Sequence, residues 1–121
     1  MARVLIVEDD PVTGMILARA TKSAGHEAVL AVNGFDALHA LEADGFDLVI
    51  SDLLMPGMTG EELYDEIRSR PRFEALPIFL TTGAVAPEQL SWLDDAKGIE
   101  LLQKPVKLAE LVERISSSTH A

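Results

Sequence analysis

Six polar residues lie at or just after the ends of short apolar runs, and their types are those that take part in metal and phosphoryl chemistry. Each run is rich in valine, isoleucine and leucine, as expected for a strand that is buried on both faces of a sheet. Because the carboxyl ends of parallel strands meet at one edge of a sheet, these polar side chains are expected to lie close together. In chain order they are Glu8, Asp9, Asp10, Asp52, Thr82 and Lys104.

Several acids at a single edge cannot be neutralised by one lysine. Two carboxylates about 4 Å apart repel by about 4 kcal/mol at an effective dielectric constant of about 20. A hard divalent cation would relieve this repulsion, and Mg²⁺ binds proteins through one or two carboxylates while keeping several waters. An aspartate beside such a cation can accept a phosphoryl group as an acyl phosphate, whose oxygens need a lysine, a hydroxyl or loop N–H groups as partners. This residue set therefore predicts metal-assisted phosphoryl transfer.

Asp52 ends the run that begins with the apolar residues 48–50, and the chain after it cannot continue a strand. Pro56 lacks an amide donor, and Gly57 and Gly60 permit tight turns. The pattern indicates a carboxylate at the end of a strand with a rigid loop beyond it. A solvated strand end would look the same in isolation, but the polar residues at the other strand ends favour a working group.

Apolar runs and amphipathic segments alternate five times along the chain. This (βα)5 pattern predicts a five-stranded parallel sheet covered on both faces by helices, with right-handed crossovers. A single domain over residues 1–121 is expected, with a core of about 3–115 and a polar tail at 116–121. The predicted strands are 3–7, 27–32, 48–52, 76–82 and 99–102, and helices are expected to begin near Pro11, Gly34, Glu61, Pro87 and Leu108.

The spacing of apolar residues predicts which face each helix buries. Asp10 precedes Pro11 and is better explained as the N-cap of the first helix than as a metal ligand. That helix is expected to bury Val12, Ile16, Ala20 and Ala24, which leaves Met15, Leu17 and Ala18 as apolar surface. In the later helices the expected inward residues are Phe35, Leu38 and Leu41, then Leu63, Tyr64 and Ile67, then Leu90 and Leu93, and finally Leu108, Leu111, Val112 and Ile115.

Trp92 stands beside Leu93 in the predicted fourth helix, which runs to Lys97 and Gly98. Adjacent helical residues point about 100° apart, so Trp92 does not share the inward direction of its neighbours. A surface for a partner and a partly buried structural aromatic are equally consistent with this position.

The composition excludes several classes of protein. The 121 residues are 48% hydrophobic and 25% charged, as in one globular domain. The absence of cysteine excludes disulfides and thiolate sites, and a net charge of −10 argues against binding to nucleic acids or acidic membranes. No apolar run approaches the roughly 18 residues of a membrane span, and the first run ends at once in acids rather than forming a targeting segment. A cytoplasmic location is expected.

Four segments of the sequence resemble the receiver domains of two-component response regulators, in particular the single-domain, chemotaxis-regulator-like type. They are residues 7–10, 52–60, 77–83 and 103–105, in family-like order and spacing, and the match extends from Val4 to about Ile115. The resemblance implies a flavodoxin-like, doubly wound, three-layer sandwich with strand order 2-1-3-4-5. It also implies a phosphoprotein that signals by phosphorylation-dependent partner binding or phosphorelay, with no enzymatic activity beyond self-phosphorylation and slow autodephosphorylation.

The resemblance assigns a role to each residue that matches the family pattern. Asp52 would be phosphorylated by a histidine kinase or a histidine phosphotransfer protein, with Mg²⁺ as the cofactor. Asp9 would bind the metal directly and Glu8 through water, together with Asp52 and the backbone carbonyl of Leu54. The switch hydroxyl would be Thr82, and the phosphate-pairing lysine would be Lys104.

Two positions depart from the family pattern, and two others bear on the lifetime of the acyl phosphate. The switch position on the last strand, usually aromatic, is Leu101, so a coupled rotation of Thr82 and an aromatic ring cannot operate in its usual form. Leu54 and Ala84 stand at the two positions that influence acyl-phosphate lifetime, and neither side chain can orient an attacking water. Slow loss of the phosphoryl group is therefore expected. Val106 follows Lys104 and Pro105 at a position where phenylalanine is common in the family.

Other functions fit the residues less well. A haloacid-dehalogenase-type phosphatase needs a second acid where Leu54 stands, and no strand is followed by a glycine-rich or P-loop nucleotide motif. Two alternatives stay open: a receiver module from a hybrid histidine kinase or longer regulator, and a non-phosphorylated interaction domain. The expected partners are the phosphodonor, docked on the first helix, and an unknown output protein, without direct DNA binding. A monomer or a weak phosphorylation-dependent dimer is expected.

Overall fold

The protein forms one parallel sheet with helices on both faces. The computed structural model describes residues 1–83 and 85–119. The strands are β1 (Arg3–Val7), β2 (Glu27–Ala31), β3 (Leu48–Asp52), β4 (Ile78–Thr82) and β5 (Ile99–Gln103). They pair in parallel in the order β2-β1-β3-β4-β5. The predicted fold class and strand order are confirmed.

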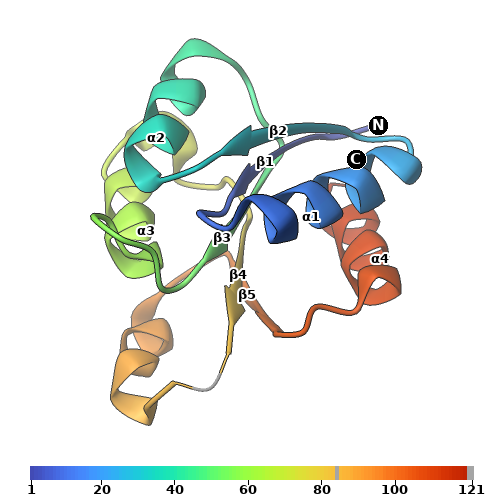
Figure 1. The fold of residues 1–121 in the computed structure, drawn as a ribbon. Coiled ribbons are helices and arrows are strands. Elements are labelled where there is room, and N and C mark those ends of the chain that lie inside the picture. Colours follow the sequence, from blue (N-terminus) through green and yellow to red (C-terminus); the bar gives the residue numbers. More distant parts are fainter. Residues whose placement is uncertain (84, 120–121) are drawn as a thin grey trace.

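Helices cover the two faces of the sheet in pairs (Figure 1). The pair α1 (Pro11–Ser23) and α4 (Leu108–Ser118) lies on one face, and α2 (Gly34–Ala43) and α3 (Gly60–Arg68) lie on the other. Three short 3-10 segments complete the described elements: η1 (Pro71–Phe73), η2 (Pro87–Gln89) and η3 (Ser91–Asp95). Helix α4 continues through Ser118, past the expected end of the core. In the described part of the chain, no helix combines the length and the apolar character needed to cross a membrane.

Two apolar layers hold the helices to the sheet. Strand side chains alternate between them, as the period of two requires. Leu5, Val49 and Leu80 pack towards α2 and α3, whereas Ile6, Ile50 and Phe79 pack towards α1 and α4. The middle strands β1, β3 and β4 are thus buried on both faces, which explains their continuous apolar sequences.

The predicted buried stripe of α1 was wrong. Val12 and Ile16 are 64% and 49% exposed, and the helix instead buries Gly14, Leu17, Ala18 and Thr21. Small residues allow this face to approach the sheet closely, since a Cβ at Gly14 would lie 3.4 Å from the side chain of Leu30. Thr21 tolerates burial because its hydroxyl donates to the carbonyl of Leu17 at 2.8 Å. The close approach of these small residues to the sheet therefore determines which face of α1 is buried, and the larger side chains of Val12 and Ile16 remain exposed.

A similar correction applies to α2. Phe35, predicted to face inward, is 60% exposed, and the helix buries Gly34, Ala37 and Leu41. Met58 occupies the space beside Gly34, where an added Cβ would lie 2.5 Å from the methionine sulfur. The tight contact between this helix start and the loop after β3 sets the rotation of α2.

The α-helix predicted to begin near Pro87 is not observed in the described residues of this segment. The described residues between β4 and β5 contain the two 3-10 turns η2 and η3, with amide-to-carbonyl bonds that span three residues, such as Leu90 to Pro87 at 3.0 Å. Trp92 is half-buried, and its ring centroid lies 5.4 Å from that of Tyr64. Of the two readings of Trp92, the structural aromatic describes this position.

Candidate functional site

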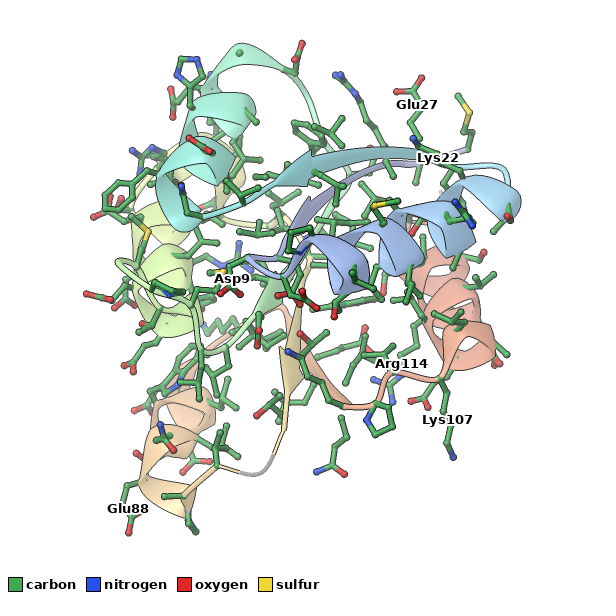
Figure 2. All side chains as sticks on the ribbon, in the orientation of Figure 1. Asp9, Lys22, Glu27, Glu88, Lys107 and Arg114 are labelled. Carbon is green, nitrogen blue, oxygen red and sulfur yellow. The ribbon has the colours of Figure 1, made fainter. Side chains whose placement is uncertain are left out.

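The polar residues after the strands gather at the carboxyl edge of the sheet. Asp52 is the last residue of β3 and is 8% exposed, and Glu8 follows β1 and is 4% exposed. Asp9 is exposed in the loop that leads to α1, at the same edge (Figure 2). Asp10 turns away to cap α1, where its carboxylate accepts from the amide and hydroxyl of Thr13.

The loop after Asp52 is pressed against the end of β3. The amide of Gly60 donates to the carbonyl of Leu53 at 2.7 Å, and a Cβ at Gly60 would lie 2.7 Å from the carbonyl oxygen of Asp52. Gly57 adopts a φ of 83°, which a residue with a side chain rarely adopts. A capping box formed by Thr59 and Glu62 then starts α3. The start of α3 is therefore held directly against the backbone of Asp52.

Three carboxylates form a cluster that suits a hard cation. Glu8, Asp9 and Asp52 each offer an oxygen, and these oxygens lie within 4.8 Å of one another. Oε2 of Glu8 accepts from the amide of Asp10 at 3.2 Å, whereas its buried Oε1 has no hydrogen-bond partner among the described residues. Burial, and next the charge of Asp52, raise the pKa of Glu8 above its usual range despite that amide bond. An all-oxygen set that includes a buried oxygen without a hydrogen bond fits the ligand preference of Mg²⁺.

Lys104 reaches this cluster from the loop after β5. Its Nζ lies 2.8 Å from Oδ2 of Asp52 and 3.7 Å from Oε1 of Glu8. Its backbone amide donates to the carbonyl of Thr82 at 2.8 Å, which joins the ends of β4 and β5. Burial lowers the pKa of Lys104, but the hydrogen bond and charge of Asp52, with the charges of Glu8 and Asp9, outweigh it and raise the pKa. The side chain therefore remains an ammonium.

Thr82 lies beside the cluster without bonding to it. The residue is 3% exposed, and its hydroxyl donates to the carbonyl of Gly83 at 3.3 Å. Leu54 donates its amide to Oδ1 of Asp52 at 3.4 Å, and its side chain is 49% exposed. Leu101, on β5, is 36% exposed. Ala84, the other residue expected to affect acyl-phosphate lifetime, lies outside the described residues.

The convergence of the strand-end residues follows from the sequence pattern, but two features of the site did not. The near-complete burial of Glu8 was not anticipated, because three consecutive acids suggest solvent. The contact between Gly60 and Asp52 was also missed, since glycine was interpreted only as a turn residue. The signal that could have revealed it is the Thr59–Glu62 capping pair, which places Gly60 at the first position of a helix.

The comparison with protein families decides the family of this fold and site. The profile described as "Response regulator receiver domain" matches residues 4–116. The chain belongs to the response regulator receiver domain family. Receiver domains are signalling modules of two-component systems that bind Mg²⁺ at an acidic pocket and interact with histidine kinases or phosphotransfer proteins.

Curated relatives place similar receiver domains in two kinds of longer protein. The transcriptional activator protein IrlR of Burkholderia pseudomallei is 35% identical over 120 residues, which cover 95% of this chain and 49% of IrlR. The sensory/regulatory protein RpfC of Xanthomonas campestris pv. campestris is 32% identical over 117 residues, covering 94% of this chain and 16% of RpfC. The chain thus spans about half the length of the first relative and less of the second.

Solved receiver structures share the fold closely. A response regulator receiver protein from Pseudomonas putida has a TM-score of 0.90 at 30% identity, with 96% of each chain covered. The receiver domain of sensor histidine kinase PA1611 from Pseudomonas aeruginosa has a TM-score of 0.87 at 26% identity, with 99% of this chain and 98% of that one covered. In that structure a magnesium ion is coordinated in the active site cleft.

Proposed function

We propose that this receiver domain accepts a phosphoryl group on Asp52 from a histidine kinase or a histidine phosphotransfer protein. A carboxylate oxygen of Asp52 forms a bond to phosphorus, the bond between phosphorus and the donor nitrogen breaks, and the electron pair leaves with the donor imidazole. The observation that carries the proposal is the pairing of Lys104 Nζ with Asp52 Oδ2 at 2.8 Å beside the Glu8, Asp9 and Asp52 oxygens. A phosphoryl group transferred to Asp52 would therefore lie beside the ammonium of Lys104, which is already in position.

Glu8, Asp9 and Asp52 would hold Mg²⁺, with Asp9 as a direct ligand, Glu8 through water, and the backbone carbonyl of Leu54 as a further ligand. The buried Oε1 of Glu8, which accepts no hydrogen bond from the described residues, and the all-oxygen donor set support this assignment. When bound, Mg²⁺ would neutralise charge on the phosphoryl oxygens during transfer. The magnesium ion in the related PA1611 receiver domain supports the same choice of metal.

Lys104 and Thr82 would stabilise the product. The ammonium of Lys104, which pairs with Asp52 before transfer, would pair with a phosphoryl oxygen afterwards. The hydroxyl of Thr82 would leave the carbonyl of Gly83 and donate to another phosphoryl oxygen. The long 3.3 Å bond to Gly83 makes this rotation inexpensive.

The acyl phosphate is expected to be long-lived. Leu54 presents an apolar, half-exposed side chain two residues after Asp52 and offers no hydrogen-bond acceptor for an attacking water. Ala84 is equally apolar in sequence. A phosphoryl half-life of only seconds, from radiolabel decay in magnesium buffer, would contradict this expectation.

The exposed apolar surface of α1 is proposed to dock the phosphodonor. Val12, Met15 and Ile16, with Leu108 of α4, line a groove of about 360 Å³ next to the Lys104 loop. Arg19 borders the groove, and α1 carries no acid in its first turn, so an acidic and apolar helical surface is the complementary partner. Ala18 was expected to belong to this surface, but it is 7% exposed and packs against the sheet.

The docking proposal predicts a selective effect of the substitution Met15→Asp. It is expected to slow phosphorylation by any phosphotransfer protein that phosphorylates the wild type, because it places a charge in the apolar groove. The rate with acetyl phosphate should not change, because a small donor does not use the groove. Equal slowing with both donors would contradict a docking role.

Intact-mass spectrometry after treatment with acetyl phosphate and Mg²⁺ tests the proposed function. The wild type should gain one phosphoryl adduct, and the Asp52→Asn variant should gain none. An adduct of equal size on both would place the chemistry on another residue. No adduct, together with no Mg²⁺-dependent binding of beryllium fluoride, would favour the non-phosphorylated interaction domain.

A further inference from the structure

A cavity of about 240 Å³ lies between the sheet and the two helices that cover one of its faces. Helices α1 and α4 run side by side over this face (Figure 1). Most of the lining is apolar and comes from both helices and from the loop after β5: Ile16, Leu17, Pro105, Val106 and Leu108. An apolar cavity of about 150 Å³ is large enough to bind benzene. This cavity is therefore large enough for one substituted ring.

Thr81 contributes a buried hydroxyl to the cavity. Its side chain points to the face of α1 and α4, because Phe79, two residues earlier in β4, packs on that face. Thr81 is 1% exposed and lines the cavity. The hydroxyls of Thr21 and Thr82 donate to carbonyls, whereas that of Thr81 forms no hydrogen bond with the described residues. Burial of a hydroxyl without a partner is unfavourable, so this group points to a ligand that bonds to it.

The other polar side chains that line the cavity are already engaged. The hydroxyl of Thr13 donates to Oδ2 of Asp10. Nζ of Lys104 lies 2.8 Å from Asp52 and 3.7 Å from Glu8, so a bound anion would meet no unbalanced positive charge. A buried water needs at least two polar partners, and the described lining offers one unengaged hydroxyl. The cavity therefore suits an apolar molecule with a single uncharged hydrogen-bonding group.

The cavity is continuous with the exposed groove on α1. Ile16 and Leu108 line both, and these side chains are 49% and 40% exposed. Exposed side chains change rotamer within nanoseconds. Thr81 belongs to a fixed wall, because its carbonyl accepts from the amide of Leu53 at 3.0 Å beside the paired strands β3 and β4. A small molecule can therefore enter between α1 and α4 without a change in the sheet.

We propose that this cavity binds a small phenol, an aromatic ring that carries one hydroxyl. The ring lies among Ile16, Leu17 and Val106, and its hydroxyl bonds to that of Thr81. A rigid ring loses less conformational freedom on binding than a flexible chain of the same size. Lys104 borders both the cavity and the acidic cluster, but the ligand does not use its charge. The site therefore does not depend on the proposed phosphorylation.

The site is tested with phenol, toluene and benzoate, which share a ring and differ in its substituent. Each is added to the unphosphorylated chain, and binding is followed by amide NMR signals. Phenol should shift the signals of residues 13–17, 81 and 104–108 saturably, and benzoate should bind more weakly because its charge is not balanced. Shifts by phenol that do not saturate would overturn the site. Tighter binding of benzoate would overturn the uncharged ligand class.

The bond to Thr81 is tested by Thr81→Val, which keeps the shape of the side chain and removes its hydroxyl. This variant should bind phenol about fivefold more weakly and toluene no more weakly than the wild type does. Thr21→Val is the matched control, because the buried hydroxyl of Thr21 is already bonded to the carbonyl of Leu17. An unchanged ratio of phenol to toluene affinity in Thr81→Val, or an equal change in the control, would overturn the assigned bond.

The location is tested by Val106→Phe, whose ring would fill the cavity. It should abolish the binding of phenol and toluene. Val12→Phe is the matched control, because Val12 is 64% exposed and lines the outer groove. Binding retained in a folded Val106→Phe variant would place the ligand elsewhere and overturn the site. Should Val106→Phe fail to fold, the comparison of Thr81→Val with Thr21→Val decides.

Discussion

The proposed phosphorylation site and the segment between β4 and β5 are held in place by different means. The site residues stand at the ends of paired, buried strands, and the loop behind Asp52 has no room for even one more carbon at Gly60. The segment rests on half-buried apolar side chains and on bonds from Tyr64 and Arg68 to a single residue, Lys97. The contrast indicates a tightly packed proposed site and a segment that fewer contacts hold in place.

The strongest way to break this contrast is to disturb the packing at Gly60. The substitution Gly60→Ala is expected to lower the free energy of unfolding by about 3 kcal/mol, because its Cβ would collide with backbone atoms of Asp52 and Leu53. It should also abolish phosphorylation by displacing Asp52. Urea unfolding measures the first effect and intact-mass spectrometry the second.

Gly45→Ala is the matched control, because a Cβ at Gly45 meets no atom of the described residues within 4 Å. Its stability should remain within about 0.5 kcal/mol of the wild type, as for an ordinary surface substitution. If both alanine variants behaved alike, the close contact at Gly60 would not be what positions Asp52.

Removal of the Lys104 ammonium is the next largest change. Lys104→Met should slow phosphorylation by acetyl phosphate roughly 10- to 100-fold, the range expected for one lost hydrogen bond to a charged group. Lys107→Met, three residues away and outside the acidic cluster, should leave the rate unchanged. Initial rates of adduct formation at saturating Mg²⁺ make the comparison, and equal rates for the two variants would remove Lys104 from the site.

Substitutions of the adjacent acids Asp9 and Asp10 distinguish metal binding from helix capping. Asp9→Asn should weaken Mg²⁺ binding at least about tenfold, because it removes a carboxylate oxygen from the three-acid cluster. Asp10→Asn should retain Mg²⁺ binding, because Asp10 bonds to Thr13 at the start of α1. Titration with Mg²⁺, followed by the amide NMR signals of residues 8–10 and 52–54, distinguishes them. Weaker binding in both variants would extend the metal site to Asp10.

The smallest expected effect sharpens the description of the segment. Ser91→Ala removes the bond to the carbonyl of Glu88 and should change the free energy of unfolding by less than about 1 kcal/mol. It should nevertheless strengthen NMR contacts between Hα of one residue and the amide four residues further along in 87–97, because the carbonyl of Glu88 is then free to accept from a backbone amide. Ser69→Ala, which removes a similar bond to the carbonyl of Glu66, should leave those contacts unchanged.

The difference between the strand-end site and the segment after β4 also explains which features could be predicted from the sequence. The strands β1 and β3 were predicted at their observed bounds, because continuous apolar runs that end in acids or turn residues leave little alternative. The gathering of Asp52, Glu8 and Lys104 followed from parallel topology alone. Local sequence was sufficient wherever the hydrophobic pattern determined the structure.

The predictions were wrong where a specific contact overruled the pattern. Gly14 and Ala18 let α1 lie close to the sheet, so that larger side chains such as Ile16 remained exposed. In the segment after β4, apolar spacing predicted an α-helix, but Ser91 and Tyr64 take groups that the helix would need. Such contacts involve residues that are distant in sequence, or hydrogen-bond donors on side chains. The spacing of apolar residues along the chain contains no information on either.

The most direct test of the account is to locate the phosphoryl group chemically. Protein treated with acetyl phosphate and Mg²⁺ is reduced with borohydride, which converts a phosphorylated aspartate to homoserine, and the peptides are sequenced by mass spectrometry. The account predicts homoserine at position 52 and at no other aspartate, and none when Mg²⁺ is removed by chelation. Homoserine at another position, or none in a sample that carries the adduct, would contradict Asp52 as the phosphoacceptor.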